Sequence, residues 1–257
     1  MLWLPSTGPA AEPPGAGRRR RPHRRNEVDT ATRSPARTRR ECAVTQERAA
    51  RTRRLLLQAA ATEFAENGYE GTSFARICAL AGISMGALTF HFPTKGRLAQ
   101  AVQEQGCNAA GAAVTQVLPQ HESALQGVVE ATLCLARLLE KDPLVRAAAR
   151  LARELPGSAD SWLRAWRPTV CRLLHRAADA GELRPDADRE VVAQLVAHLV
   201  AGTEWYVWAR SAWPGGAGAA GTADEQLARI WELALPGIAA RWQPDGAARP
   251  PGRANSP

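Results

Sequence analysis

The sequence contains little of what catalysis and metal binding usually require. Its five cysteines show no Cys-x-x-Cys spacing, and its histidines are dispersed, with no nucleophile or dyad partner arranged beside them. It has neither a glycine-rich phosphate-binding loop nor a His-Glu-x-x-His motif. We therefore expect no enzymatic activity, no cofactor and no metal site.

Long apolar runs and disulfide spacing are also missing. No apolar stretch approaches the ~20 residues that a membrane-spanning helix needs, and the apolar start at residues 1–5 is too short for a signal peptide. Scattered thiols are typical of a reducing compartment, so we expect a cytoplasmic protein without a membrane partner. A redox or metal sensor stays open as an alternative use of the cysteines.

Negative charge is scarce at the N-terminal end. Residues 1–45 carry ten arginines against four acids, residues 46–100 carry a net charge of +3, and the remainder carries −1. The first 45 residues lack apolar periodicity, which predicts disorder, and the same is expected of residues 243–257. The N-terminal extension is a solvated tail, upstream sequence from a mistaken start site, or a basic arm that follows DNA.

The most informative stretch is residues 72–95, TSFARICALAGISMGALTFHFPTK, which predicts two short helices around a tight turn. Ser73 and Ser84 can cap the two helices, and Gly82 fits a left-handed turn between them. The second helix leaves mostly small or polar residues outward: Met85, Gly86, Thr89 and His91, with Phe90 between them. This is the build of a helix-turn-helix, whose second helix enters the DNA major groove. An unrelated helical hairpin is the alternative.

The helix expected before this stretch supports DNA binding. It places Leu56, Ala60 and Phe64 on one face and should end at Asn67-Gly68, while arginines that include Arg51 crowd its start. Basic residues at a helix N-terminus oppose the helix dipole, so contacts to phosphate explain them better than helix stability does.

These residues resemble the N-terminal domain of the tetracycline-repressor (TetR) family. The resemblance is carried by LLQAAATEFAENG at 56–68, Gly-Thr-Ser at 71–73, Ala-Gly-Ile-Ser at 81–84 and GALTFHF at 86–92, followed by Lys95. It spans about residues 46–106 and is nearest to the branch of the γ-butyrolactone autoregulator receptors. A looser resemblance to that branch continues through residues 123–126, 160–162 and 180–183.

The resemblance implies a set of DNA contacts. They fall on Ser84, Met85, Gly86, Thr89, Phe90 and His91, with Lys95 as a phosphate-binding lysine, and we add Arg51, Ser73 and Arg76 to this predicted surface. Most relatives have Tyr at the position of Thr89 and Glu at that of Gly96. These departures affect which operator is bound rather than whether DNA is bound.

Past residue 100 the periodicity predicts helix after helix, at about 94–118, 121–140, 143–154, 159–180, 187–212 and 223–242. In the family, the last two helices of each subunit form a four-helix dimer interface. The predicted interface residues are Leu195, Leu199, Tyr206, Leu227, Ile230 and Trp231. An intrachain core is the alternative, because periodicity alone does not separate the two.

Tryptophan is the next informative residue type, since most of the eight lie in the C-terminal half. By resemblance, Trp162 takes the place of a pocket tryptophan of the butyrolactone receptors, and Val128, Leu135, Leu144 and Ala148 would line the same space. An indole suits an amphipathic ligand, because its face is apolar and its N–H can bond to an oxygen. A packing role in the core is the alternative.

We therefore predict an all-α homodimer. An N-terminal three-helix helix-turn-helix DNA-binding domain at 46–106 (motif about 72–92) precedes a C-terminal six-helix ligand-binding and dimerisation domain at 107–242. The expected function is repression from a pseudo-palindromic operator in double-stranded DNA, relieved by a small apolar effector such as a γ-butyrolactone. The alternatives are a pseudo-receptor for an antibiotic or biosynthetic intermediate, and an all-α enzyme or carrier that keeps the motif only as structure.

Overall fold

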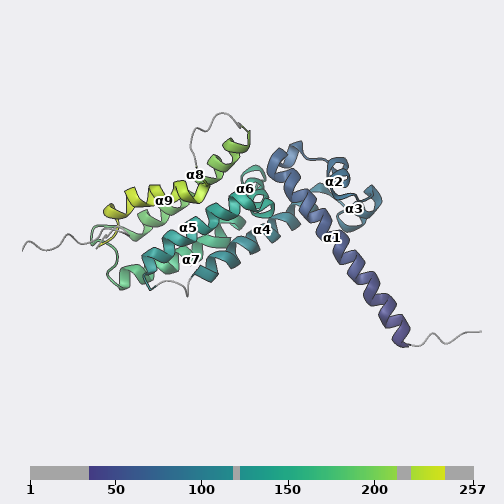
Figure 1. Ribbon diagram of the computed structural model, residues 1–257, viewed down its shortest axis with the longest axis horizontal. Helices are drawn as coiled ribbons and strands as arrows, with labels where there is room; N and C mark the ends of the chain where they lie inside the picture. Colours follow the sequence, from purple (N-terminus) through teal and green to yellow (C-terminus); the bar gives the residue numbers. More distant parts are fainter. Residues whose placement is uncertain (1–34, 118–121, 213–220, 241–257) are drawn as a thin grey trace, which may run out of the picture. The chain divides into compact units, whose positions relative to one another are not determined.

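The computed structural model describes residues 35–117, 122–212 and 221–240, and every regular element in these ranges is helical (Figure 1). The elements are α1 (Pro35–Gly71), α2 (Phe74–Ala81), α3 (Met85–His91), α4 (Lys95–Val117), α5 (Ala124–Lys141), α6 (Pro143–Glu154), α7 (Ala159–Asp179), α8 (Arg189–Ala212), α9 (Ala223–Ala234) and the 3-10 helix η2 (Leu235–Gly237). One isolated bridge pairs Leu183 with Ala239. The predicted all-α class is confirmed.

The chain divides into two compact units, residues 1–44 and 45–257. Helix α1 begins at Pro35, so residues 35–45 are helical where disorder was predicted. The reason is local: residues 36–50 contain no glycine or proline and are rich in alanine, arginine and glutamate, which favour helix. Three further segments lie outside the described residues: the rest of the N-terminal extension, residues 214–220 of a glycine-rich loop, and the predicted tail at 243–257.

The predicted end of the first DNA-binding helix is marked by a break inside α1. Gly68 has φ 71° and ψ −177°, which is not helical and which glycine adopts without steric cost. The hydroxyl of Thr72 then donates to the carbonyl of Gly68 at 2.7 Å and fixes the turn into α2. The sequence pattern at Asn67-Gly68 therefore predicted this break correctly.

Helix α9 is shorter than predicted. It ends at Ala234 and continues as the single turn η2, instead of running to about residue 242. Pro236 is the physical cause, since proline has no N–H to donate and its ring clashes with the carbonyl four residues earlier.

A first hydrophobic core lies among α1, α2, α3 and α4 and includes residues from α6. Its fully buried members are Leu56, Ala60, Ala61, Phe64, Ile77, Leu88, Leu98, Ala99, Val102, Ala147 and Leu151. Because Ala147 and Leu151 belong to α6, the core of the predicted DNA-binding part includes side chains from the C-terminal body. The two parts are therefore packed together within one unit.

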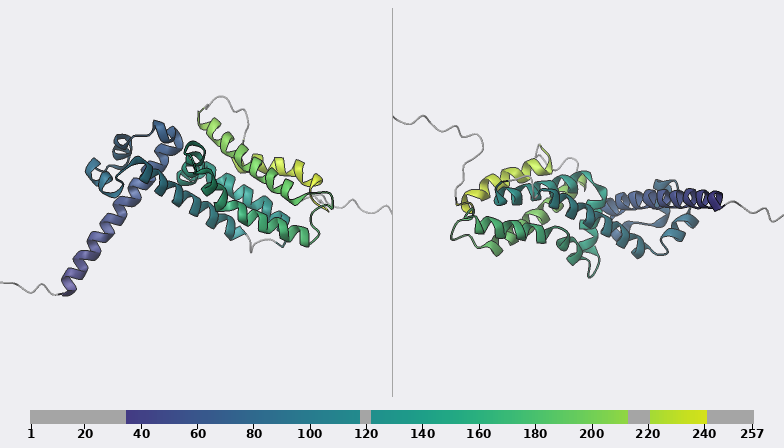
Figure 2. Two further views of the ribbon diagram at one scale, coloured as in Figure 1. Left: turned by 180° about the vertical axis from the view of Figure 1, so that it is seen from behind. Right: turned by 90° about the horizontal axis from the view of Figure 1, so that it is seen from below.

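A second core fills the C-terminal bundle, in which α5 packs against α4, α6, α7, α8 and α9. Figure 2 shows these helices side by side from two further directions. The largest fully buried side chains in this core are Trp166 and Trp231, together with Leu135, Leu139 and Leu173.

No single helix in the described ranges is long and apolar enough to span a membrane. Helices α2 and α3 pass that test only together, as a pair bent by 108°.

Two glycines bring α4 close to its neighbours. A Cβ placed on Gly106 would lie 2.2 Å from the carbonyl oxygen of Leu144, and one placed on Gly111 would lie 2.7 Å from that of Ala165. Neither backbone oxygen can move away without shifting its helix. Helix α4, which links the two parts, is therefore held against α6 and α7 by backbone contact.

Candidate functional site

Helices α2 and α3 form the predicted helix-turn-helix. They are bent by 108° relative to each other, inside the ~90–120° range of such motifs. The N–H of Arg76 donates to Ser73 Oγ and that of Ala87 to Ser84 Oγ, both at 3.3 Å, so each serine caps its helix. Gly82 closes α2 with φ 66°. Ser73 and Ser84, predicted as DNA contacts, thus have an observed structural role as caps.

The two faces of α3 differ sharply. Leu88 is fully buried and Phe92 is 4% exposed, whereas Met85 is 45% and Phe90 81% exposed. The ring of Phe90 contacts His91 edge to face, at 5.3 Å between centroids. The outer face of α3 therefore presents two large apolar side chains, Met85 and Phe90, that are available for contact with another molecule.

Gly86 and Thr89 shape the rest of this face. A Cβ on Gly86 would meet nothing of the described residues within 4 Å, so packing against them does not require glycine there. The Thr89 hydroxyl donates to the carbonyls of Met85 and Gly86, at 3.1 and 3.2 Å, which occupies its proton inside the helix. The methyl group of Thr89 and the lone pairs of its hydroxyl oxygen remain available to a ligand.

The predicted basic contacts have mixed surroundings. Arg51 is exposed, whereas Arg76 Nε lies 3.0 Å from Glu63 Oε2. Lys95 Nζ lies 4.5 Å from the ring centroid of Tyr69 and donates to the carbonyl of Glu70 at 3.4 Å. Arg76 and Lys95 therefore also tie α2 and α4 to the end of α1, a role that the sequence did not indicate.

The residues predicted to line a ligand pocket are packed into the core instead. Val128, Leu135 and Ala148 are fully buried and Trp162 is 5% exposed, all in the second core, while half-buried Leu144 packs against the first. None of them lines a cavity described below. The ligand-pocket role of these residues stays a prediction.

Trp162 has a polar partner that the sequence did not reveal. Its Nε1–H donates to Glu204 Oε1 at 2.7 Å, and the other oxygen of Glu204 pairs with Arg153. Glu204 is 8% exposed, and this burial raises its pKa above the ordinary value of 4.5, against the opposing effects of Arg153 and the Trp162 N–H. The indole N–H of Trp166, by contrast, is buried and without a hydrogen-bond partner in the described structure.

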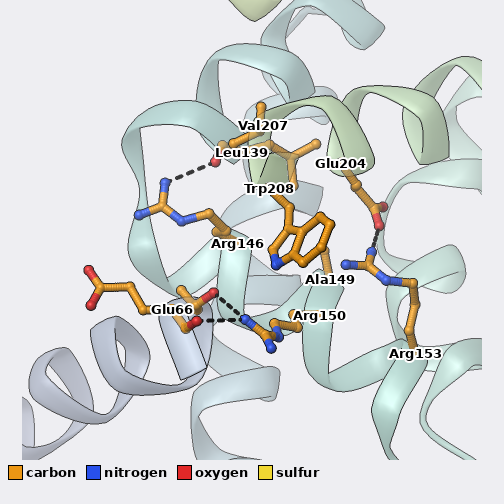
Figure 3. Close-up of a pocket in the computed structure, with 10 residues that line it drawn as sticks. Glu66, Leu139, Arg146, Ala149, Arg150, Arg153, Glu204, Val207 and Trp208 are labelled. Carbon is orange, nitrogen blue, oxygen red and sulfur yellow. Dashed lines mark hydrogen bonds and ion pairs between the residues drawn. The ribbon is translucent and has the colours of Figure 1, made fainter. Parts of the chain in front are cut away.

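A cavity of about 320 Å³ opens among α1, α5, α6 and α8 (Figure 3). Arg146, Arg150 and Arg153 reach it from one face of α6, and Glu204 and Trp208 reach it from α8. Sequence reasoning missed it, although arginines at spacings of four and three on one helix face were a usable signal. A second, more open hollow of about 700 Å³ lies between α4 and the turn that joins α6 to α7.

The predicted dimer-interface residues fall into two groups. Leu195, Leu199 and Tyr206 are half-buried and Ile230 is 46% exposed, so their surfaces remain available. Leu227 and Trp231, in contrast, are 2% and 1% exposed in the protomer's own core, and Trp231 Nε1 donates to Thr132 Oγ1 at 2.7 Å. Both side chains pack in the intrachain core, because α9 turns them towards α5.

The described residues hold no group of three or more His, Cys, Asp or Glu side chains placed to bind a metal ion. Four cysteines, Cys78, Cys107, Cys134 and Cys171, are free and half-buried. Burial raises the thiol pKa of Cys107 and Cys134, which keeps them protonated and weakly nucleophilic.

Comparison with known proteins places this architecture. Residues 56–102 match the model of a family described as bacterial regulatory proteins, tetR family. The A-factor receptor protein of Streptomyces griseus is 30% identical over 210 residues, which cover 78% of this chain and 70% of that protein.

Solved structures agree with the sequence comparison. A γ-butyrolactone receptor (ArpA-like protein) is 27% identical with a TM-score of 0.60, over 74% of this chain and 90% of that one. CprB of Streptomyces coelicolor A3(2) is 29% identical with a TM-score of 0.63, over 76% and 91%. The structure of CprB in complex with its biological operator sequence is 29% identical with a TM-score of 0.57, over 74% of this chain and 90% of that one.

Proposed function

Because the chain belongs to the TetR family of bacterial regulatory proteins, we propose that it is a homodimeric, cytoplasmic repressor that binds operator DNA and is released by a small molecule. The observation that carries this proposal is the α2–α3 motif. Its second helix buries Leu88 and Phe92 and turns Met85, Gly86 and Phe90 outward. Such a face, at the basic end of the chain, fits a major groove.

The surface that meets DNA would be centred on α3. Gly86 allows the helix backbone to approach the bases, while Thr89 and Phe90 offer apolar contacts suited to a thymine methyl group. Arg51, exposed on α1, and Lys95, at the start of α4, are the candidate phosphate contacts. In a twofold dimer, two such helices bind half-sites about 34–36 Å apart, or a multiple of that, so the operator is a pseudo-palindrome.

The effector would act through α4 and α6, the helices that join the DNA-binding part to the body. An Arg150–Glu154 ion pair on α6, 2.7 Å long, binds the end of α1: Arg150 Nη1 donates to the carbonyls of Ala65 and Glu66, and the Tyr69 N–H donates to Glu154. A ligand that displaces α6 therefore moves α1 and α4 with it. It changes DNA affinity only if it binds the DNA-competent and released states unequally.

A γ-butyrolactone is the first effector to test, since the relatives include proteins named A-factor receptor and γ-butyrolactone receptor. A second candidate is a repressor of the same kind that answers a different ligand. It is supported by the complete burial of Val128, Leu135 and Ala148 in the second core, which agrees with the packing role that was the alternative for the predicted pocket residues. Both candidates share the operator and differ in the effector.

Selection of DNA from a random palindromic library, at a stated salt concentration, tests the proposal. We expect one enriched pseudo-palindrome, bound by a dimer, and a loss of affinity when the arginine at 51 or the lysine at 95 is replaced by alanine. The absence of any sequence-specific binding would contradict the repressor and favour an all-α carrier or enzyme. Titration of the operator complex with butyrolactones, followed by tryptophan fluorescence, then separates the two effector classes.

A further inference from the structure

The cavity between α1, α5, α6 and α8 combines a basic wall with an apolar one. Arg146, Arg150 and Arg153 project from α6, and the indole of Trp208 lies among them in Figure 3. Leu139 and Val207 add apolar surface around the indole. At about 320 Å³ the cavity falls within the range of small-molecule sites.

The charges in this cavity do not cancel. Glu204 pairs with Arg153, but Arg146 pairs with no carboxylate in the described part of the chain; its Nη1 donates to the carbonyls of Leu139 and Glu140, at 3.2 and 2.8 Å. Glu66 is exposed and forms no ion pair with these arginines in the same part. Arg150 pairs with Glu154 through Nε, at 2.7 Å, and directs Nη1 to carbonyl oxygens. The residues that line the cavity include three arginines and two glutamates, and Arg146 is the guanidinium among them that is available to attract an anion.

Carbonyl oxygens are weaker partners for a guanidinium than a carboxylate is. Charge-assisted bonds between arginine and carboxylate are shorter and about twice as strong as neutral ones, and they are often bidentate. An incoming carboxylate would therefore compete well for Arg146 and for the Nη1 end of Arg150, whose Nε keeps its pairing with Glu154. The apolar part of the same molecule would pack on Trp208.

We propose that this cavity binds an amphipathic organic anion, a carboxylate joined to an aromatic or aliphatic group, and that the bound carboxylate draws Arg150 away from α1. Arg150 Nη1 holds the carbonyls of Ala65 and Glu66, at 3.0 and 2.9 Å, directly before the break at Gly68. Occupancy thus loosens the attachment of the DNA-binding part to α6. Only the consequence for operator affinity rests on the proposed function.

Calorimetric titration of the full-length protein tests the ligand class without DNA. The probes are naphthalene-2-carboxylate, indole-3-acetate and octanoate, with naphthalene-2-carboxamide as the uncharged match of the first. We expect at least one acid to bind, and naphthalene-2-carboxylate to bind about tenfold or more tightly than its amide. Binding of none of the three acids at millimolar concentration, or equal affinity for acid and amide, overturns the proposal.

Variants locate the binding. Arg146→Gln should remove the preference for acid over amide, and Ala149→Leu, which adds volume to a 2% exposed wall residue, should weaken both probes. Arg164→Gln is the matched control, since Arg164 pairs with Asp160 on the surface of α7, where both are 72% exposed. Thermal melts check that each variant folds. An acid preference that survives Arg146→Gln places the anion elsewhere and overturns the site.

Hydrogen exchange tests the link to α1, again without DNA. Amides between residues 65 and 72 should exchange faster when naphthalene-2-carboxylate is bound, because Arg150 no longer holds the carbonyls there. Unchanged exchange at saturation overturns the coupling. The calorimetric and hydrogen-exchange experiments use no operator DNA. A failure of operator binding would therefore refute the proposed function without affecting the test of this cavity.

Discussion

At the scale of single residues, Gly86 separates what folding requires from what binding requires. It lies in the first turn of α3 with helical backbone, and a Cβ there would meet no atom within 4 Å in the part of the chain that the structure describes. Glycine costs a helix about 0.5–1 kcal/mol relative to alanine. Folding alone would therefore favour alanine at this position.

We predict that Gly86→Ala raises the free energy of unfolding by about 0.5–1 kcal/mol and weakens operator binding by roughly tenfold, within the ~1–3 kcal/mol of one base contact. The added methyl group would hold α3 away from the groove. Chemical denaturation and fluorescence anisotropy with the selected operator measure the two effects. Unchanged operator affinity would show that DNA does not approach α3 at Gly86.

Glu204 gives a prediction about pH. Burial raises its pKa above 4.5 in the folded protein, so between 4.5 and that raised value the folded chain retains a proton that the unfolded chain has released. The stability that comes from this group is therefore present at low pH and is lost as pH rises through the folded-state pKa.

Glu204→Gln should remove this dependence while keeping an oxygen for the Trp162 N–H. We expect the unfolding free energy of the unmodified protein, relative to Glu204→Gln, to fall as pH rises above about 4.5. Denaturant unfolding at a series of pH values measures the difference. A difference that increases with pH would mean that the ion pair with Arg153 outweighs burial, and that the pKa is lowered instead.

At the scale of elements, the contact of α4 with α6 decides how firmly the two parts are joined. Gly106 lies where a Cβ would come within 2.2 Å of a backbone oxygen of α6 and 2.6 Å of the Ala148 Cβ. Gln103 adds a polar link from α4, donating from Nε2 to Ser161 Oγ at 2.9 Å. The junction therefore depends on small size at one position of α4.

Gly106→Ala should destabilise the protein by about 1–3 kcal/mol, because overpacking at a backbone contact forces the two helices apart. The same exchange at Gly86, where the space is open, is the matched control and should have the opposite sign. Thermal or chemical unfolding compares the two variants directly. Equal effects of both exchanges would mean that α4 and α6 separate easily.

At the scale of the whole molecule, the exposed apolar residues of α8 and α9 indicate where a second copy would dock. Trp205 and Val191 on α8 are 65% and 59% exposed, and Ile230 and Leu233 on α9 are 46% and 84% exposed. Large apolar side chains exposed on two helices that contact each other are candidates for a protein–protein interface. With Leu195, Leu199 and Tyr206, they define the proposed dimer interface.

Ile230→Asp should shift the dimer towards monomer, since it places a charge in an apolar contact, and should weaken operator binding because only one half-site is then held. Sedimentation at several concentrations measures the first effect and operator titration the second. Leu163→Asp, on the exposed side of α7 at 39% exposure, is the control. A dimer that persists in Ile230→Asp would place the interface elsewhere.

The sequence by itself determined the helix-turn-helix. Ser73, Gly82 and Ser84 act through bonds to residues three or four positions away, so the local pattern contains the whole cause. The same holds for the break at Gly68, where a positive φ selects glycine. Periodicity likewise predicted which residues of α3 are buried, because the spacing of apolar residues fixes one face of a helix.

Only the tertiary structure decided which helix covers each apolar face. Leu227 and Trp231 pack in the core that includes α5, and Glu204 accepts from Trp162 across 42 positions of sequence. Glu182 caps the start of α5, accepting from the N–H groups of Ala124 and Leu125 at 3.0 and 2.8 Å, so two distant motifs meet. Periodicity shows that the apolar face of a helix must be covered, but it does not show which helix covers it. The basic cavity is lined by four separate helices, so it forms only when these helices have packed together.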